Sequence, residues 1–455
     1  MNLDTLKRRV MGAVLQPGDP DYADAVTGFN LAVRREPVAV IEAVSTQDVV
    51  ETVRFARDAG TPLVVQSTGH GSTPVEGPFL LLRTSLLSAC IVDPAGWARV
   101  GAGVRWSTVL EQAASFGLAP LAGSAPHVGV VGYLTGGGYG PVARTHGLAS
   151  DRVRCFEVVT GDGELHRATP TEDPELFWAL RGGKGALGVV TSVEIDLLPI
   201  PTLFGGAVWF AGEDLAEVLR GWRDWAEQLP AEGTTSLAVQ RLPEAPGIPA
   251  PLAGRLTVAV RFAWTGEALE GERVFARLRG VAPVIFGDVD EMPYAALGSI
   301  HQDPTTPIPA TERNALFDGL PDPALDALVA AVGPGSASPH SLVELRQLGG
   351  AIGLSEVPSA VCHRGAAYSM LIASLEVAGA GEAAAEHAGR MLQTLSPWTI
   401  PGILPNFRAI ASAADVRDAY DAPTLARLAA LVDGFDPQGT LLDGRRVREA
   451  VVLTR

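Results

Sequence analysis

Apolar residues near the start of the chain form short runs that alternate with helically spaced positions, a pattern typical of strands and helices in turn. Residues 37–44 are almost entirely apolar and predict a strand. Ser45 and Asp48 resemble a helix-capping pair, and the helix that they predict ends before Gly60. Residues 62–65 then predict a second short, buried strand.

The same pattern extends over the rest of the first 200 residues. It predicts strands at 79–82, 89–92, 98–104, 152–160, 164–168 and 189–198, and helices at 108–116 and 174–180. Gly161-Asp162-Gly163 is a strong turn signal, so the strands on either side of it should pair as a hairpin. The glycine-rich stretch after residue 117 contains too much glycine for a helix interior and predicts loops.

From residue 202 to about residue 400 the pattern changes. Alternating apolar and polar residues predict strands such as 254–262 and 341–346, and helical spacing predicts helices at 216–229, 268–278 and 383–395. Strands separated by helices and Pro-rich loops predict a second domain of the α+β class.

Composition narrows the possible partners. The 455 residues carry a formal net charge of −16, which argues against nucleic acid, because phosphate binding needs an excess of Lys and Arg. No apolar run approaches the ~20 residues that span a membrane, and no secretory signal is visible at the N-terminus. Cys90, Cys155 and Cys362 show neither metal-ligand nor disulfide spacing. We therefore expect a cytoplasmic protein, monomeric or homodimeric, with no nucleic-acid, membrane or metal partner.

The strand at 62–65 runs into a glycine-containing loop, Gln66-Ser67-Thr68-Gly69-His70-Gly71-Ser72. Gly69 and Gly71 allow positive φ and a close backbone approach, so amide groups can converge on an anion beside His70. By itself the loop is equally consistent with a turn whose His bonds a neighbouring carbonyl. A second glycine cluster at 123–140 and a third segment at 147–151 favour ligand binding.

One glycine motif resembles a dinucleotide-binding fingerprint but does not have its sequence context. Residues 183–188 match G-x-G-x-x-G, but they follow a predicted helix and enter a predicted strand. A dinucleotide fingerprint has the reverse order. The motif therefore predicts a tight helix-to-strand turn, and a nicotinamide dehydrogenase is disfavoured.

The order and spacing of the three glycine segments resemble the vanillyl-alcohol oxidase/berberine bridge enzyme superfamily of FAD-linked oxidoreductases. The matching blocks are 147–153, 157–160, 174–183 and 188–191. The chain is most similar to the bacterial hydroxynicotine-oxidase branch. The resemblance implies an α+β fold: a PCMH-type FAD-binding domain of two α+β subdomains at 1–200, and a substrate domain with an antiparallel sheet flanked by helices at 201–400. Residues 401–455 would return to the FAD-binding domain.

The resemblance also implies that His70 carries FAD covalently through its 8α-methyl group. Some relatives have a second link through a Cys, but the matching position here is Ala125, so we expect attachment through His70 only. A Val at the Val128 position leaves room for O2 in this family, although an ordinary packed Val is an equal interpretation. The residues implied to contact the cofactor are Gln66, Ser67, Thr68, Gly69, His70, Gly71, Ser72, Ser124, Ala125, Val128, Gly129, Gly132, Gly136, Gly138, Gly140, Val190 and Asn406.

The sequence also departs from the family pattern. Gln66 stands where many relatives have Arg, and Val131 where they have Gly. Leu404 stands at the position of the Tyr that serves as catalytic base in sugar and alcohol oxidases. Because a neutral amine needs no such base, this departure tilts the substrate toward amine-like molecules.

The expected function is an FAD-dependent oxidase of secondary metabolism that takes hydride from a C–H beside O–H or N–H of a small or medium natural-product-like molecule. Flavin N5 would accept the hydride, and O2 would reoxidise the flavin and give H2O2. Candidate catalytic residues on the sheet of the second domain are Glu344, Arg346 and Tyr368, because alternate positions of a strand face one way. Glu344 and Arg346 are also consistent with an ion pair on a solvated face. The alternative function is a flavin-scaffold protein that binds or sequesters a molecule without turnover.

Overall fold

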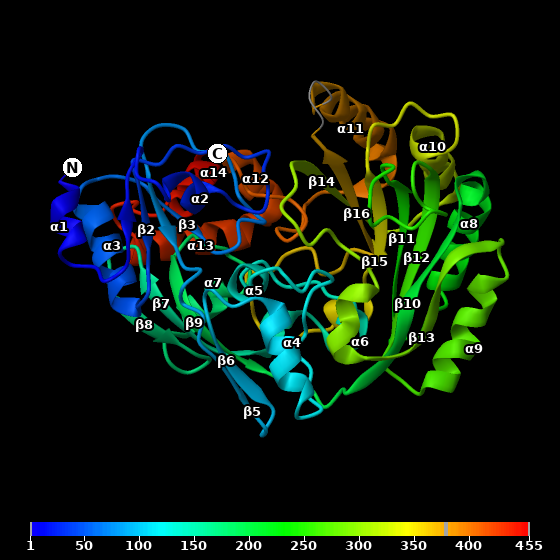
Figure 1. Cartoon of the computed structure of the whole chain (residues 1–455), viewed down its shortest axis with the longest axis horizontal. Helices are drawn as coiled ribbons and strands as arrows, with labels where there is room; N and C mark the ends of the chain where they lie inside the picture. Colours follow the sequence, from blue (N-terminus) through cyan, green and yellow to red (C-terminus); the bar gives the residue numbers. More distant parts are fainter. Residues whose placement is uncertain (1, 377–380, 454–455) are drawn as a thin grey trace.

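A computed structural model describes residues 2–376 and 381–453. The chain builds three β-sheets, of four, five and eight strands. The two smaller sheets form one half of the molecule, and the largest forms the other half (Figure 1). The fold is mixed α+β.

The four-stranded sheet has the order β1-β2-β4-β3, and its last three strands run parallel. Its strands are β1 Val14–Leu15, β2 Ala39–Glu42, β3 Leu63–Gln66 and β4 Leu80–Arg83, and the helices of this part are α1 Leu3–Lys7, α2 Tyr22–Val26 and α3 Thr46–Asp58. Ser45 caps α3 by accepting a hydrogen bond from the Asp48 amide at 3.1 Å. Gly60 has φ +62° after the helix. The predicted start and end of this helix are confirmed.

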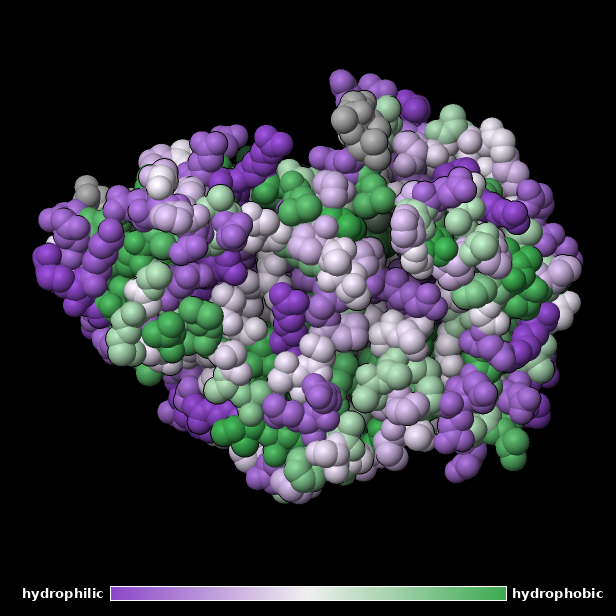
Figure 2. All heavy atoms as spheres, viewed as in Figure 1, coloured by the Kyte–Doolittle hydropathy of each residue, from purple (hydrophilic) through white to green (hydrophobic). Residues whose placement is uncertain are grey.

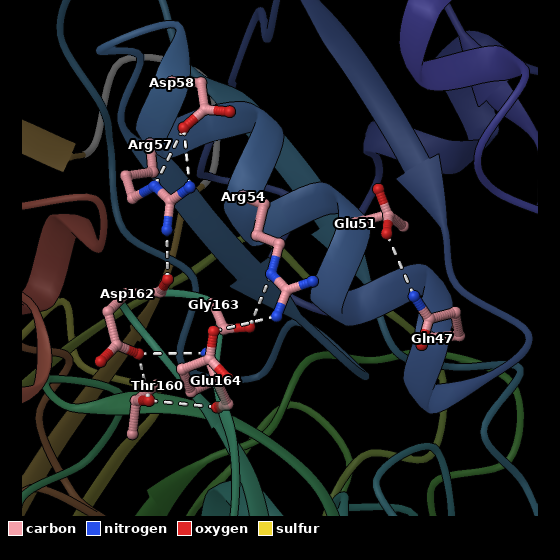
Figure 3. A network of polar contacts seen from close by, with 9 residues as sticks. All are labelled: Gln47, Glu51, Arg54, Arg57, Asp58, Thr160, Asp162, Gly163 and Glu164. Atoms are coloured by element: carbon pink, nitrogen blue, oxygen red, sulfur yellow. Dashed lines mark hydrogen bonds and ion pairs between the residues drawn. The ribbon is translucent and has the colours of Figure 1, made fainter.

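The five-stranded sheet is antiparallel, with the order β5-β6-β9-β7-β8. Its elements are β5 Cys90–Asp93, β6 Trp97–Gly101, α4 Trp106–Ala114, β7 Val153–Thr160, β8 Leu165–Ala168, α7 Pro174–Leu180 and β9 Gly188–Asp196. The hairpin β7–β8 turns at Asp162 and Gly163, as predicted. Arg54 and Arg57 of α3 donate to the carbonyls of Gly163 and Asp162 and so join the two smaller sheets (Figure 3).

The glycine-rich stretch contains two short helices, α5 Val130–Leu134 and α6 Ala143–His146. The expectation that this stretch forms only loops is therefore wrong. Val130 and Leu134 of α5 are fully buried, and the packing of these side chains outweighs the helix-disfavouring effect of Gly132. Residues Ala149–Arg152 add a turn of 3-10 helix, η1.

The eight-stranded sheet has the order β13-β10-β12-β11-β15-β16-β14-β17, and its strand pairs are antiparallel. The strands are β10 Thr202–Ala211, β11 Gly233–Arg241, β12 Leu256–Trp264, β13 Val284–Pro293, β14 Ala310–Phe317, β15 Leu342–Gln347, β16 Tyr368–Leu375 and β17 Thr399–Ile400. Helices α8 Leu215–Ala226, α9 Ala268–Arg279, α10 Asp322–Val332 and α11 Gly381–Leu395 cover one face, with short 3-10 turns η2 Gly212–Asp214, η3 Tyr294–Ser299, η4 Gly350–Ile352 and η5 Ser396–Trp398 between elements. The other face is turned toward the first half of the molecule (Figure 1).

The C-terminal segment packs against the first half. It consists of α12 Ala413–Ala419, α13 Ala422–Phe435 and α14 Leu442–Val452 (Figure 1). The Leu63 amide of β3 donates to the Thr440 carbonyl at 2.8 Å, and Tyr420 Oη donates to the Gly182 carbonyl at 2.8 Å. The space-filling view has a notch in its outline between the two halves (Figure 2). Among the described helices, none is both long and apolar enough to cross a membrane.

Candidate active site

The loop after β3 is held close to the backbone of residues 28–30. Gly69 has φ +79°, and a Cβ at this position would lie 2.5 Å from Gly28 Cα, so only glycine fits. The Phe29 amide donates to the Thr68 carbonyl at 3.0 Å. The His70 ring stacks on the Phe29 ring with centroids 3.7 Å apart. These contacts fix the position of the His70 imidazole.

His70 is held in its neutral form. Burial, together with the nearby His127 and Arg105, lowers its pKa from 6.5 to about 3. Its Nε2 atom is buried and has no hydrogen-bond partner among the described residues. The His127 ring lies 4.9 Å from the His70 ring, centroid to centroid. An unprotonated, unpartnered imidazole is the form that can act as a nucleophile.

The polar side chains of the loop bond to protein groups. Ser67 Oγ donates to the Ala102 carbonyl at 2.9 Å. Gln66 Nε2 donates to the Thr27 carbonyl at 3.3 Å, and Ser72 Oγ donates to Gln66 Oε1 at 3.3 Å. These bonds fix the conformation of the loop. An added Cβ at Gly71 would meet no atom within 4 Å, so the backbone borders open space there.

The second glycine segment is fixed by Asn406. Its Oδ1 accepts from the Gly138 amide at 3.0 Å, and its Nδ2 donates to the Tyr133 carbonyl at 3.1 Å. Gly138 has φ +84°, and a Cβ at Gly140 would lie 2.3 Å from the Ala122 carbonyl oxygen. These glycines are required by close packing.

Gly129 and Gly132 belong to the same segment. A Cβ at Gly129 would lie 3.5 Å from Thr68 Cγ2, so the two glycine segments are neighbours. At Gly132 an added Cβ would meet no atom within 4 Å. Lys184 Nζ donates to the Gly132 carbonyl at 3.3 Å, and burial lowers the pKa of this ammonium to about 8 despite Asp443.

Other residues expected at the cofactor have mainly structural contacts. Ser124 Oγ donates to Asp303 Oδ2 at 2.7 Å and so links this segment to the other half of the molecule. The Ala125 carbonyl accepts from the Val128 amide at 3.1 Å, and Val128 packs against the core that includes Val190. A Cβ at Gly136 would clash with Lys184 and Asn406.

The residues present fit FAD. The open space beside Gly71 and Gly132 and the Lys184 ammonium suit an anionic pyrophosphate. The unpartnered Nε2 atom of His70 suits a covalent link to the flavin. Ala125 offers no thiol for a second link.

Glu344 and Arg346 lie on the face of the large sheet that is not covered by helices. Glu344 Oε1 accepts from Arg261 at 2.6 Å and from Ser236 Oγ at 2.8 Å. Glu344 Oε2 accepts from Arg346 Nε at 2.7 Å. The ion pair that the sequence left open is present, but it is buried: Glu344 is 1% exposed. Strand alternation predicts which residues share a face of the sheet, but it does not predict whether that face is buried or exposed to solvent.

This environment argues against Glu344 as a catalytic base. Burial by itself raises the pKa of Glu344, but Arg346, Arg261 and His301 outweigh it, so the net pKa is well below its usual value. His301 is neutral, because burial first, and then Arg346 and Arg261, lower its pKa to about 3. Glu344 therefore stays ionised and holds Arg346 in place.

Tyr368 lies on the opposite face of the sheet from Glu344 and Arg346. It packs among the helix-covered core residues, and its ring centroid lies 5.9 Å from that of Trp222. Because β16 pairs Ser369, and not Tyr368, with Arg346, the register turns Tyr368 away. The expectation that the three candidates share a face is therefore wrong for Tyr368.

Two acidic residues at this face were missed by the sequence reading. Glu312 of β14 lies on the same face as Asn314, whose side-chain oxygen accepts from the Leu404 amide at 2.8 Å. Glu312 is exposed to solvent on one side, while desolvation by the surrounding atoms and the nearby Asp303 raise its pKa to about 7. Glu312 and Asp303 are nine residues apart in separate segments, so no local motif signals them.

Comparisons with known proteins support an FAD-binding domain. An FAD binding domain family matches residues 37–169. The (R)-6-hydroxynicotine oxidase of Paenarthrobacter nicotinovorans is 32% identical over 284 residues, which cover 61% of this chain and 60% of that protein. The solved structure of 6-hydroxy-D-nicotine oxidase from Arthrobacter nicotinovorans is 25% identical and covers 95% of this chain and 97% of that one, with a TM-score of 0.84. The chain therefore contains an FAD binding domain, and it is similar to hydroxynicotine oxidase among the FAD-linked oxidoreductases of the vanillyl-alcohol oxidase/berberine bridge enzyme superfamily.

Other FAD-linked oxidoreductases align less completely in sequence. The glucooligosaccharide oxidase of Sarocladium strictum is 32% identical over 251 residues, 51% of this chain and 50% of that protein. The chain thus matches between half and two thirds of the length of these two curated relatives. The BBE-like 1 structure from Physcomitrella patens shares the fold, with 19% identity, a TM-score of 0.84 and coverage of 97% of this chain and 98% of that one. FAD is the cofactor that the matched domain binds.

Proposed function

We propose that this protein is an oxidase that removes hydride from a C–H beside O–H or N–H of a small or medium natural-product-like molecule, with O2 as the electron acceptor and H2O2 as the product. The observation that carries the proposal is the neutral, unpartnered His70 imidazole beside two glycine segments with open backbones. Bound FAD supplies the hydride acceptor and the two-electron link to O2. The substrate-side residues come from the uncovered face of the large sheet.

His70 is proposed as the only covalent attachment point. Its ring is positioned by Phe29, and its low pKa keeps it neutral across the physiological range. The remaining loop and segment residues bind the cofactor through their backbone, and Asn406 positions the Gly138 amide. Lys184 contributes a cation beside Gly132.

On the substrate side, Glu344 positions Arg346 and Glu312 accepts the substrate proton. Leu404 is fully buried and offers no acid–base group at the position of the family's Tyr. Glu312 titrates near neutrality, which suits a general base. Glu312 therefore replaces Glu344 in the role of base.

The first test is the attachment of flavin. The purified protein is precipitated with acid, and flavin fluorescence is measured in the pellet for the parent and for His70→Ala. We expect fluorescence in the parent pellet and none in that of the variant, because the variant lacks the imidazole. Flavin released from both proteins would contradict the covalent link, and a colourless parent would contradict the flavoprotein assignment.

The second test separates an oxidase from a flavin-scaffold protein that only binds its ligand. Leu404 in place of Tyr is the observation that keeps this alternative open. A panel of amines and alcohols is screened for catalase-sensitive H2O2 formation. Peroxide supports the oxidase, and ligand binding without flavin reduction supports the scaffold protein.

A further inference from the structure

A cavity lies between the glycine segment and the uncovered face of the large sheet. Tyr139 and Gly140 form one wall, and Ser236 of β11, Arg261 of β12 and Arg346 of β15 form another. The cavity has a volume of about 30 Å³, room for a small group such as a carboxylate, and it is partly open to solvent. We propose that this cavity binds an anionic group of the substrate, a carboxylate. This inference rests on the proposed function and names its substrate class.

Buried hydrogen-bond donors without partners line the cavity. Tyr139 Oη, Thr234 Oγ1 and Arg261 Nε are buried and bond to no atom of the described residues. Tyr139 is 4% exposed and Arg261 is 2% exposed. An unsatisfied buried donor is costly, and these three donors outnumber the unpartnered acceptor Gln347 Oε1 of the same lining, so they point to an occupant that accepts hydrogen bonds.

The charge of the lining has the sign that attracts an anion. Arg261 and Arg346 line the cavity, and no Asp or Glu does so. Glu344 lies behind the two arginines and bonds to both, so it neutralises only one of them. His301 also lines the cavity and is neutral. The lining itself therefore carries one net positive charge, and Asp303, outside the lining, is close enough to interact with Arg346.

Arg346 is oriented so that its outer nitrogens stay free. Its Nε donates to Glu344, and its guanidinium carbon lies 4.8 Å from the centroid of the Phe407 ring. Its two terminal nitrogens have no partner within residues 2–376 and 381–453. The guanidinium group of Arg346 is planar. Glu344 contacts one of its edges and the Phe407 ring one of its faces, so its other edge can bind a carboxylate.

The cavity is next to the cofactor site. Tyr139 and Gly140 directly follow Gly138, whose amide is held by Asn406. Apolar side chains complete the lining, among them Phe262, Ile300 and Leu348. A substrate anchored here by its carboxylate would therefore have its apolar body beside the glycine segment that borders FAD.

The test compares three ligands of one shape and different charge. Benzoate, benzamide and benzylammonium are titrated into the holoprotein by calorimetry. We expect benzoate to bind at least ten-fold more tightly than either of the others. Equal or weaker binding of benzoate would overturn the proposal, and the cavity would then hold only water.

Two conservative variants locate the site. Tyr139→Phe and Thr234→Val each remove one unpartnered hydroxyl, and we expect each to weaken benzoate binding about five- to ten-fold without lowering the Tm. Thr257→Val is the matched control, because the Thr257 hydroxyl on β12 is also buried and unpartnered but lies outside the cavity lining. Tight benzoate binding that neither variant weakens would overturn this location. The calorimetric readout needs no turnover, so a failure of oxidase activity is distinguished from a failure of the carboxylate site.

Discussion

At the residue scale, burial decides which groups are charged. His70 and His301 are both neutral because burial lowers the pKa of each to about 3. Glu344 is equally buried but ionised, since two arginines surround it. Desolvation therefore keeps His70 neutral, whereas at Glu344 the two arginines outweigh desolvation and keep the carboxylate charged.

Glu312 makes the pH dependence testable. Its pKa of about 7 means that the carboxylate form, which can accept a proton, accumulates as the pH rises through 7. We expect the rate of flavin reduction, measured anaerobically by stopped flow, to rise over this range and to lose that rise in Glu312→Gln.

Asp303→Asn is the control for this profile. Asp303 contributes to the raised pKa of Glu312, so its neutralisation should move the rising limb to lower pH. A parent profile that is flat from pH 6 to pH 8 would remove Glu312 from the mechanism.

Glu344→Gln tests the positioning role. The amide has nearly the same size, but it leaves Arg261 and Arg346 without their buried anion, and breaking a buried pair costs about 3–5 kcal/mol. We expect a large loss in the free energy of unfolding, measured with denaturant at pH 7. Because the fold lowers the pKa of Glu344, its contribution is present above pH 4.5 and is lost as the pH falls further. A variant of parental stability would contradict this role.

At the element scale, short elements are held by contacts between distant segments. Helix α3 is joined to the β7–β8 hairpin by Arg57, which donates to the Asp162 carbonyl at 2.5 Å, and by Arg54, which pairs with Glu164 at 3.0 Å (Figure 3). The Arg57 side chain is 27% exposed, so its bond is partly shielded from water. The two smaller sheets are thereby held together at one edge.

We expect Arg57→Ala to lower the free energy of unfolding by about 1 kcal/mol, the usual value of one hydrogen bond. Arg9→Ala is the matched control, since Arg9 forms only a 3.6 Å ion pair with Glu51 and is 49% exposed. The midpoints of denaturant unfolding measure both effects. Equal shifts in the two variants would mean that the Asp162 contact adds nothing.

Element boundaries show how far local patterns extend. The α3 helix, the β7–β8 hairpin and α7 Pro174–Leu180 agree with the prediction because caps, turn residues and Pro act locally. Helix α5 was missed because its stability comes from the packing of Val130 and Leu134, which composition does not reveal.

At the scale of the whole molecule, both halves contribute residues to the proposed site. The glycine segments come from the half built on the two smaller sheets, and Glu344, Arg346 and Glu312 come from the large sheet. Asn406, after the large sheet, reaches back to Gly138, and Ser124 bonds to Asp303 across the boundary. The site therefore depends on how the halves are packed, and a shift between them would move every substrate-side group at once.

The sequence by itself was enough to indicate an FAD-linked oxidoreductase and to propose the FAD-binding loops and His70. Glycine at positions such as Gly69 is required by a positive φ and a close backbone approach, and these requirements are visible in the order of residues. The tertiary structure decided the chemistry around them. Whether Glu344 is a base or an anchor, and where Glu312 titrates, depends on residues far away in the chain, because a pKa is set by neighbours in space.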